Sequence, residues 1–243
     1  MFCRRLAIWT ADDWNSAGPE ADEIRINKLG WDLTDFGSGA FSKCGLLLFT
    51  LRNGNLLDPT NLKSYAEKIM VVDENQVTPF HFHWKKTEDI INRGGGKLVV
   101  ELYNSDAQDG FTLDAVRARC DGVLRAVKAG SHVILNPGES ITVTPRLYHK
   151  FYGHPGTGKV LVGEVSSVND DATDNRFKDP AGRFPQIDED EMPLHYLCNE
   201  YPAARAQDNK MSLSQMFVAR APPPVRRDSA RGGLLCRHTA ARV

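Results

Sequence analysis

Two histidines and a glutamate lie within eight residues, in the segment His81-Phe82-His83-Trp84-Lys85-Lys86-Thr87-Glu88. The run from Val77 to Trp84 is rich in β-branched and aromatic residues, which predicts a strand. Because successive side chains of a strand alternate between its faces, His81 and His83 are expected on the same side. A turn through 85–87 could return Glu88 to the same point. Imidazole nitrogens together with a carboxylate suit a divalent first-row metal, so the segment predicts a metal site.

The fourth ligand is expected from another part of the chain. His149 is the best candidate because it lies in Leu147-Tyr148-His149-Lys150-Phe151, a strand-like run that follows a turn at Thr144-Pro145-Arg146. The alternative for His149 is an ordinary histidine that forms hydrogen bonds in the core. For the cluster around His81 that alternative is weaker, because burying two imidazoles and a carboxylate is costly unless they share a partner.

Length, charge and cysteines restrict the class of protein. A chain of 243 residues can bury one sizeable core, and we expect one domain. The formal net charge of -1 gives no reason to expect nucleic acid or an anionic membrane surface as a partner, so a small molecule is expected. The five cysteines contain no CxxC pair and fit a reducing compartment. No apolar run approaches the roughly 20 residues of a membrane span, and no signal peptide is recognised, so a cytoplasmic protein is predicted.

Short apolar or alternating runs separated by turn signals predict a mainly β fold, a sandwich or barrel, with helices only at its periphery. Glycine, asparagine and proline clusters, among them Gly94-Gly95-Gly96, are interpreted as turns between these runs. The predicted strands are Gly45 to Leu51, Ala66 to Val72, Val77 to Trp84, Lys97 to Tyr103, Gly122 to Val127, Ser131 to Leu135, Ser140 to Thr144, Leu147 to Tyr152 and Lys159 to Val165.

Two short helices are predicted. Thr10 is expected to cap a helix that begins with acidic residues, and Asp58 is expected to cap another that runs through Lys68. The chain is divided into a helical or irregular segment (1–42), a β barrel whose C-terminal cover includes Leu194 to Tyr201 (43–204), and a tail (205–243) whose composition predicts disorder.

Two sets of residues then resemble the metal-binding motifs of cupins. They are H-x-H-x4-E-x6-G from His81 to Gly95, and Asn136-Pro137-Gly138 with Pro145 and His149. The resemblance implies a jelly-roll β-barrel. The sequence departs from the cupin pattern at Asn75 and Arg146, where glycine is usual, but neither departure removes a ligand.

Longer motifs resemble the D-lyxose isomerase family within the cupins. They are Leu29 to Gly39, Thr78 to Gly96, and Gly163 to Ser166 running into Asn169 to Asp171. The family implies manganese held by His81, His83, Glu88 and His149, and interconversion of D-lyxose and D-xylulose. Sheet edges exposed in such a barrel favour a homodimer.

Moving a proton between adjacent carbons requires an acid/base group. Glu164 is the best candidate because it lies in the run Lys159 to Val165, where alternation can turn it inward; an outward, structural carboxylate is the alternative. Lys86 could stabilise the developing oxyanion or carry a proton, against the alternative of a solvated surface lysine.

A sugar substrate also needs apolar walls and hydrogen-bond partners. Trp84 and Tyr148 are predicted as walls, with Phe80 more simply explained as core. The residues predicted to hold hydroxyl groups are Arg146, Asn169, Asp170 and Asp171.

Two other functions remain open from the residues alone. Three histidines and a glutamate can hold iron in a cupin dioxygenase, which would consume oxygen. A metal-containing sugar-binding module would bind without catalysis and would not need Glu164 or Lys86. The sequence does not separate manganese from iron, cobalt or zinc, nor D-lyxose from D-mannose.

Overall fold

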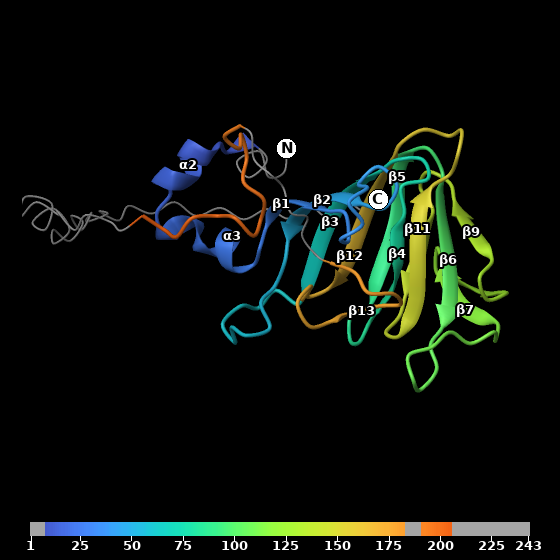
Figure 1. Cartoon of the computed structure of the whole chain (residues 1–243). Coiled ribbons are helices and arrows are strands. Elements are labelled where there is room, and N and C mark those ends of the chain that lie inside the picture. Colours follow the sequence, from blue (N-terminus) through green and yellow to red (C-terminus); the bar gives the residue numbers. More distant parts are fainter. Residues whose placement is uncertain (1–7, 183–190, 206–243) are drawn as a thin grey trace, which may run out of the picture. The chain divides into compact units, whose positions relative to one another are not determined.

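The computed structural model describes residues 8–182 and 191–205, and almost all of the predicted tail lies outside them (Figure 1). The helices are few and short, at Ala11–Ser16 (α2), Pro19–Ala21 (η1, a 3-10 turn) and Asp22–Ile26 (α3). The strands are Gly30–Thr34 (β1), Leu46–Arg52 (β2), Tyr65–Val72 (β3), Thr78–His83 (β4), Glu88–Gly95 (β5), Leu98–Asn104 (β6), Val116–Cys120 (β7), Val123–Val127 (β8), His132–Leu135 (β9), Ser140–Val143 (β10), Leu147–Gly153 (β11), Val160–Ser167 (β12) and Asn175–Phe177 (β13).

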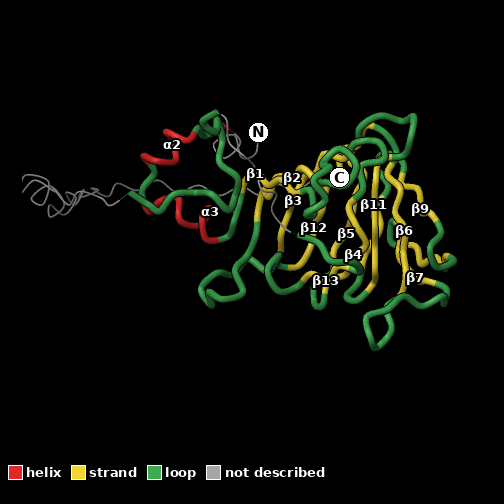
Figure 2. The backbone as a smooth tube through the Cα atoms, in the orientation of Figure 1, coloured by secondary structure: helices red, strands yellow, loops and turns green. Residues whose placement is uncertain are grey.

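The strands form two antiparallel sheets. One has eight strands in the order β1-β2-β3-β12-β5-β10-β7-β8, and the other has five in the order β13-β4-β11-β6-β9. Figure 2 shows the helices gathered next to β1, away from most of the strands. A mainly β, jelly-roll-type fold with peripheral helices is therefore confirmed, although no ladder among the described residues joins the two sheets into a closed barrel.

The main core fills the space between the sheets. The eight-stranded sheet contributes Leu48, Met70 and Val162, and the five-stranded sheet contributes Leu102 and Phe151, all of them buried. Such alternating strands can bury one face against the other sheet while the opposite face stays polar. No helix of the described residues is long and apolar enough to cross a membrane.

All nine predicted strands are present, with small shifts at their ends. Strands β1, β5, β7 and β13 were not predicted from the sequence. Gly94 and Gly95 were predicted as part of a turn, whereas both belong to β5, next to a register shift between β5 and β12. Their φ angles are 154° and 86°, and a Cβ on Gly95 would lie 2.2 Å from the Lys159 carbonyl oxygen. Glycine is needed here inside a strand, where the neighbouring backbone comes close.

The predicted cap at Thr10 is confirmed. Thr10 is the N-cap of α2, its Oγ1 accepts the Asp13 N–H at 3.3 Å, and the Asp13 carboxylate accepts the Thr10 N–H at 2.8 Å. This reciprocal pair is a capping box.

The helix predicted from Asp58 to Lys68 is wrong. The side chains of Asn55, Asp58 and Asn61 each accept the backbone N–H two residues further on, at 2.9 to 3.1 Å. These local bonds favour turns over a helix. From Tyr65 onward the chain is β3, which pairs with β2 and β12.

The boundaries at the ends of the chain also differ from the expectation. The segment before residue 43 contributes strand β1 to the large sheet. Within the predicted C-terminal cover, Tyr201 contacts the helical segment: its ring stacks on Trp14 at 4.0 Å, and its hydroxyl donates to the Leu29 carbonyl at 2.8 Å. Tyr196 and Tyr201 therefore pack with the helical segment.

Candidate active site

A β-bulge in β4 directs three side chains into one cavity. His149 of β11 faces His81, but Phe151, two residues further, faces Thr78, three residues away. The extra residue lies at Pro79 and Phe80, and proline, which has no N–H to donate, is tolerated at such a bulge. Because the bulge changes the alternation, Thr78, His81 and His83 all line the same cavity.

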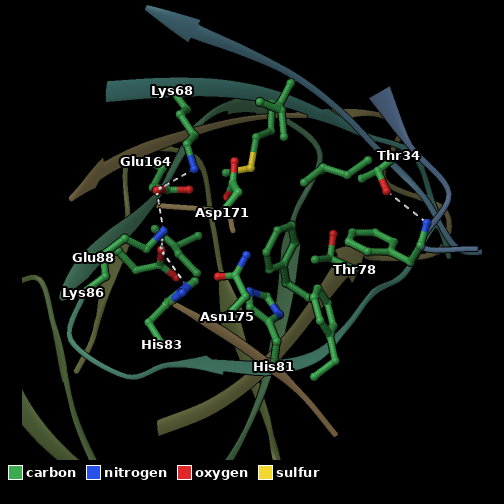
Figure 3. Close-up of a pocket in the computed structure, with 17 residues that line it drawn as sticks. Thr34, Lys68, Thr78, His81, His83, Lys86, Glu88, Glu164, Asp171 and Asn175 are labelled. Atoms are coloured by element: carbon green, nitrogen blue, oxygen red, sulfur yellow. Dashed lines mark hydrogen bonds and ion pairs between the residues drawn. The ribbon is translucent and has the colours of Figure 1, made fainter. Parts of the chain in front are cut away.

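The structure brings three of the predicted ligands together from β4 and β11. One side-chain nitrogen from each of His81, His83 and His149 lies within 4.8 Å of the others, and all three residues are buried. Figure 3 shows His81 and His83 at the cavity. Nδ1 of His81 lies 2.8 Å from the Pro79 carbonyl oxygen and Nδ1 of His149 lies 3.1 Å from that of Leu147. A carbonyl only accepts, so each Nδ1 carries the proton and each Nε2 keeps a lone pair for a ligand.

Glu88 approaches the histidines from the opposite sheet, as the first residue of β5. Its Oε1 lies 2.9 Å from Nε2 of His149, and its Oε2 lies 3.3 Å from Nε2 of His83. Neither contact has the geometry of a hydrogen bond, and both of these nitrogens are buried without a hydrogen-bond partner in the described part of the chain. These buried nitrogens accept no hydrogen bond and lie around a carboxylate. A divalent metal ion would be a suitable partner shared by the nitrogens and the carboxylate.

The surroundings hold these groups in the protonation states that a metal requires. Burial, with the neighbouring imidazoles, lowers the pKa of His81 well below its ordinary value, and burial together with Lys86 lowers that of His83. Burial alone would raise the pKa of Glu88, but Lys86 and the histidines lower it well below its ordinary value. The imidazoles of His81 and His83 are therefore neutral and the Glu88 carboxylate is ionised at neutral pH, with no proton to displace.

A second carboxylate, Glu164 of β12, lies beside the ligand cluster between two buried lysines. Its Oε1 is 2.9 Å from Nζ of Lys86 and 3.3 Å from Nζ of Lys68. Lys86 also lies 2.7 Å from Oε2 of Glu88, and Lys68 donates to Oδ1 of Asn169 at 2.6 Å. Glu164 therefore faces inward, as predicted. Lys86 is a buried lysine and not a surface lysine.

The charges of this cluster stabilise one another. Burial raises the pKa of Glu164, but Lys68 and Lys86 outweigh it and the pKa falls below its ordinary value. For Lys86, burial lowers the pKa, but the carboxylates of Glu164 and Glu88 outweigh it and raise the pKa above its ordinary value. Glu164 is therefore ionised and able to accept a proton, and Lys86 is positively charged.

Asp174 fixes the loop that carries Lys86. Residues 84–87 connect β4 to β5 and so cross between the two sheets. The buried Asp174 carboxylate accepts the N–H groups of Lys85 at 2.8 Å and Lys86 at 3.0 Å, and its carbonyl accepts the N–H of Trp84 at 3.1 Å. Three consecutive backbone donors thus bind one residue.

Of the residues predicted to contact a sugar, Asp171 lines this cavity and the others do not. Trp84 and Asp170 line a separate outer pocket. The Tyr148 side chain is fully buried, and its hydroxyl donates to the Asp109 carbonyl at 2.8 Å. The Arg146 guanidinium lies over the rings of Phe82 and Trp84 and pairs with Asp109. The side chains of Tyr148 and Arg146 therefore bond to the loop around Asp109, and Trp84 and Asp170 lie at the outer pocket.

The sequence analysis missed Lys68, Asn175 and Thr78, which also line the cavity. A signal for Lys68 was available: it alternates in phase with the buried residues Ala66, Met70 and Val72. A lysine at a core position of a strand needs a buried partner of opposite charge. Thr78 was hidden because the bulge changes which residues of β4 face inward.

The two departures from the cupin pattern lie at left-handed backbone positions. Asn75 has a φ of 58° and Arg146 a φ of 63°, in the region where glycine is least strained. Asparagine is the residue that most readily replaces glycine there, whereas arginine is less common. Both positions keep the backbone conformation for which glycine is usual, so the motif geometry survives the substitutions.

Comparison with known proteins identifies relatives of this chain. A family model described as D-lyxose isomerase matches residues 4–201. A D-lyxose/D-mannose isomerase of Serratia proteamaculans is 58% identical over 179 residues, covering 74% of this chain and 78% of the relative. A D-lyxose/D-mannose isomerase of Escherichia coli O157:H7 is 53% identical over 197 residues, covering 81% and 87%.

Among solved structures, an L-ribose isomerase of Cellulomonas parahominis with L-ribose aligns with a TM-score of 0.47 and 19% identity, over 74% of this chain and 98% of that one. The family match spans most of the chain, including the histidines, both carboxylates and both buried lysines. The chain belongs to the D-lyxose isomerase family.

Proposed function

We propose that this chain is a metal-dependent aldose–ketose isomerase that interconverts D-lyxose and D-xylulose through a cis-enediol. One observation carries the proposal: a buried set of three histidines and Glu88 lies beside a carboxylate, Glu164, that is held ionised by two lysines. Sugar isomerisation is also the activity for which both relatives are named. The same relatives are named for D-mannose, which shares the configuration of D-lyxose at carbon 2, so D-mannose is a second expected substrate.

His81, His83, His149 and Glu88 would hold the metal, and manganese is the ion that we propose. A divalent ion in this set of three neutral imidazoles and one carboxylate keeps a net charge of +1. When bound, it supplies Lewis-acid stabilisation of the negative charge that develops on the sugar oxygens.

The chain's own residues would carry the proton. Both lysines contact Oε1 of Glu164, and within the described residues Oε2 has no ion-pair or hydrogen-bond partner. We assign Glu164 as the group that removes the proton from carbon 2 of the aldose and returns it to carbon 1. Lys86 would stabilise the negative charge on the adjacent oxygen, because its Nζ is buried and positively charged.

The test is turnover of metal-stripped protein on D-lyxose, with and without added manganese, followed by detection of D-xylulose. Manganese-dependent product that is absent in Glu88→Gln is the expected result. Stoichiometric bound metal without any product would contradict the proposal. In that case, oxygen consumption would point to a dioxygenase, and sugar binding without turnover would point to a binding module. The homodimer and the cytoplasmic location stay predictions.

A further inference from the structure

The inner face of the cavity changes from polar to apolar along the strands. On β3, Lys68 faces inward, and the next inward residue is Met70. On the antiparallel strand β12, Glu164 faces inward, and the inward residue two positions before it in the chain is Val162. The two rows are in register, because Lys68 pairs with Glu164 and Met70 pairs with Val162. The acid/base cluster therefore belongs to one row and an apolar wall to the next.

The five-stranded sheet has the same gradient. His81 faces His149, and one step along the ladder Thr78 faces Phe151. In Figure 3, Thr78 and Thr34 lie on the side of the cavity away from Lys68, Glu164 and Glu88. The apolar side chains that line the cavity are Phe36, Leu46, Leu48, Met70, Ile90, Phe151 and Phe177. Two of them, Ile90 and Phe177, are in register with Glu164 and His81, and the other five form the apolar half.

Thr78 is the exception in this apolar half. Its side chain is 2% exposed, and its Oγ1 is buried without a hydrogen-bond partner among the described residues. The other threonine, Thr34, already accepts the Phe36 N–H at 3.0 Å. A buried hydroxyl without a partner is costly, and it is rare unless a ligand or a water satisfies it.

We propose that the Thr78 hydroxyl binds the hydroxyl on carbon 5 of the aldose, and that the apolar wall around it selects against any further hydroxyl. The inference rests on the proposed function, which fixes carbons 1 and 2 beside Glu164. Thr78 lies three residues from His81 along β4, at most about 10 Å. That separation is long enough for a contact between the sugar and His81, an extended chain of four carbons, and a hydrogen bond from the sugar to Thr78. One pentose can therefore place its reacting carbons beside Glu164 and its carbon 5 hydroxyl beside Thr78.

The substrate class follows from this arrangement. Pentoses and 6-deoxyhexoses place hydrogen or a methyl group in the apolar end, whereas a hexose such as D-mannose buries an additional hydroxyl with no protein partner. Such a hydroxyl loses its bonds to water on binding. We expect 6-deoxy-D-mannose to be converted with a kcat/KM about tenfold above that of D-mannose.

The test combines Thr78→Val, which has the same shape without the hydroxyl, with the rescue variant Thr78→Ser. On D-lyxose, Thr78→Val is expected to lower kcat/KM about tenfold and Thr78→Ser much less. On 5-deoxy-D-lyxose, Thr78→Val is expected to match the wild type, because the partner hydroxyl is missing. For each sugar, the kcat/KM of the wild type is divided by that of the variant. Differences between the sugars in their ring forms affect both enzymes equally and cancel in this ratio.

Two results would overturn the inference: an equal loss for Thr78→Val on both pentoses, or D-mannose converted at least as well as 6-deoxy-D-mannose. Failure of the proposed function is distinguishable, since the manganese-loaded wild type would then produce no ketose from any of these sugars.

Discussion

Nζ of Lys86 lies 2.9 Å from Oε1 of Glu164, although 78 residues separate them in the sequence. The same ammonium lies 2.7 Å from Oε2 of Glu88. One buried cation therefore joins the carboxylate proposed as a metal ligand to the carboxylate proposed as the acid/base group. A change at Lys86 must affect both, because both carboxylates are buried and each lies 2.9 Å or less from the Lys86 ammonium group.

Replacing Lys86 by methionine removes the cation and keeps the length of the side chain. Two buried carboxylates then lose a partner, and such a change typically costs about 3–5 kcal/mol in the free energy of unfolding. Urea denaturation of the metal-free protein measures it. Lys85→Met is the matched control, because Lys85 is exposed and its change is expected to be within about 0.5 kcal/mol. Equal stability of the two variants would contradict the ion-pair network.

The effect of Lys86→Met should depend on pH. The pKa values of Glu88 and Glu164 are lowered in the folded chain. Their contribution to the free energy of unfolding is therefore fully present above the ordinary glutamate pKa. It is lost as the pH falls through the lower pKa values of the folded chain. The difference in unfolding free energy between wild type and Lys86→Met should therefore be largest near neutral pH and shrink below about pH 4. A pH-independent difference would point to lost packing instead of lost charge.

Glu164→Gln tests the proton carrier without emptying the metal site. The amide keeps the shape but cannot accept the proton, so kcat is expected to fall about 10²- to 10⁴-fold while bound manganese stays at one per chain. Elemental analysis of the purified variant gives the metal content. Glu101→Gln is a control, since Glu101 lies on β6, forms an ion pair with Lys150 of β11 and does not line the cavity. Loss of metal together with activity would show that Glu164 acts on the ligand set instead.

The cluster of histidines and Glu88 could be predicted from sequence because all of its parts except His149 are local. His81 and His83 are two residues apart on one strand, Glu88 follows within one short loop, and His149 lies in an evident strand. The prediction needed only alternation and the preferences of metal ligands.

The rest of the cavity depends on pairing between distant strands. Lys68 reaches Glu164 only because β3 and β12 are neighbours in register, and no local pattern predicts that pairing. Thr78 faces inward only because of the bulge opposite β11. Arg146 and Tyr148 were assigned to the cavity by their nearness to His149, but their side chains bond to the loop around Asp109.

Asp174 should act through Lys86. Its carboxylate accepts two consecutive backbone N–H groups of the loop that carries Lys86, and an asparagine has a single acceptor oxygen. Asp174→Asn is expected to lower kcat/KM about tenfold while the manganese content is unchanged.

A double-mutant cycle separates this role from general destabilisation. If Asp174 positions Lys86, Lys86→Met should cost less activity in the Asp174→Asn background than in the wild type, because the lysine is already displaced. Asp170→Asn is the matched control: its carboxylate also binds nearby N–H groups, but those of Ala172 and Thr173 in its own turn. Additive effects of Asp174→Asn and Lys86→Met would show that Asp174 supports the fold alone, since a positioning residue and the residue that it positions cannot act independently.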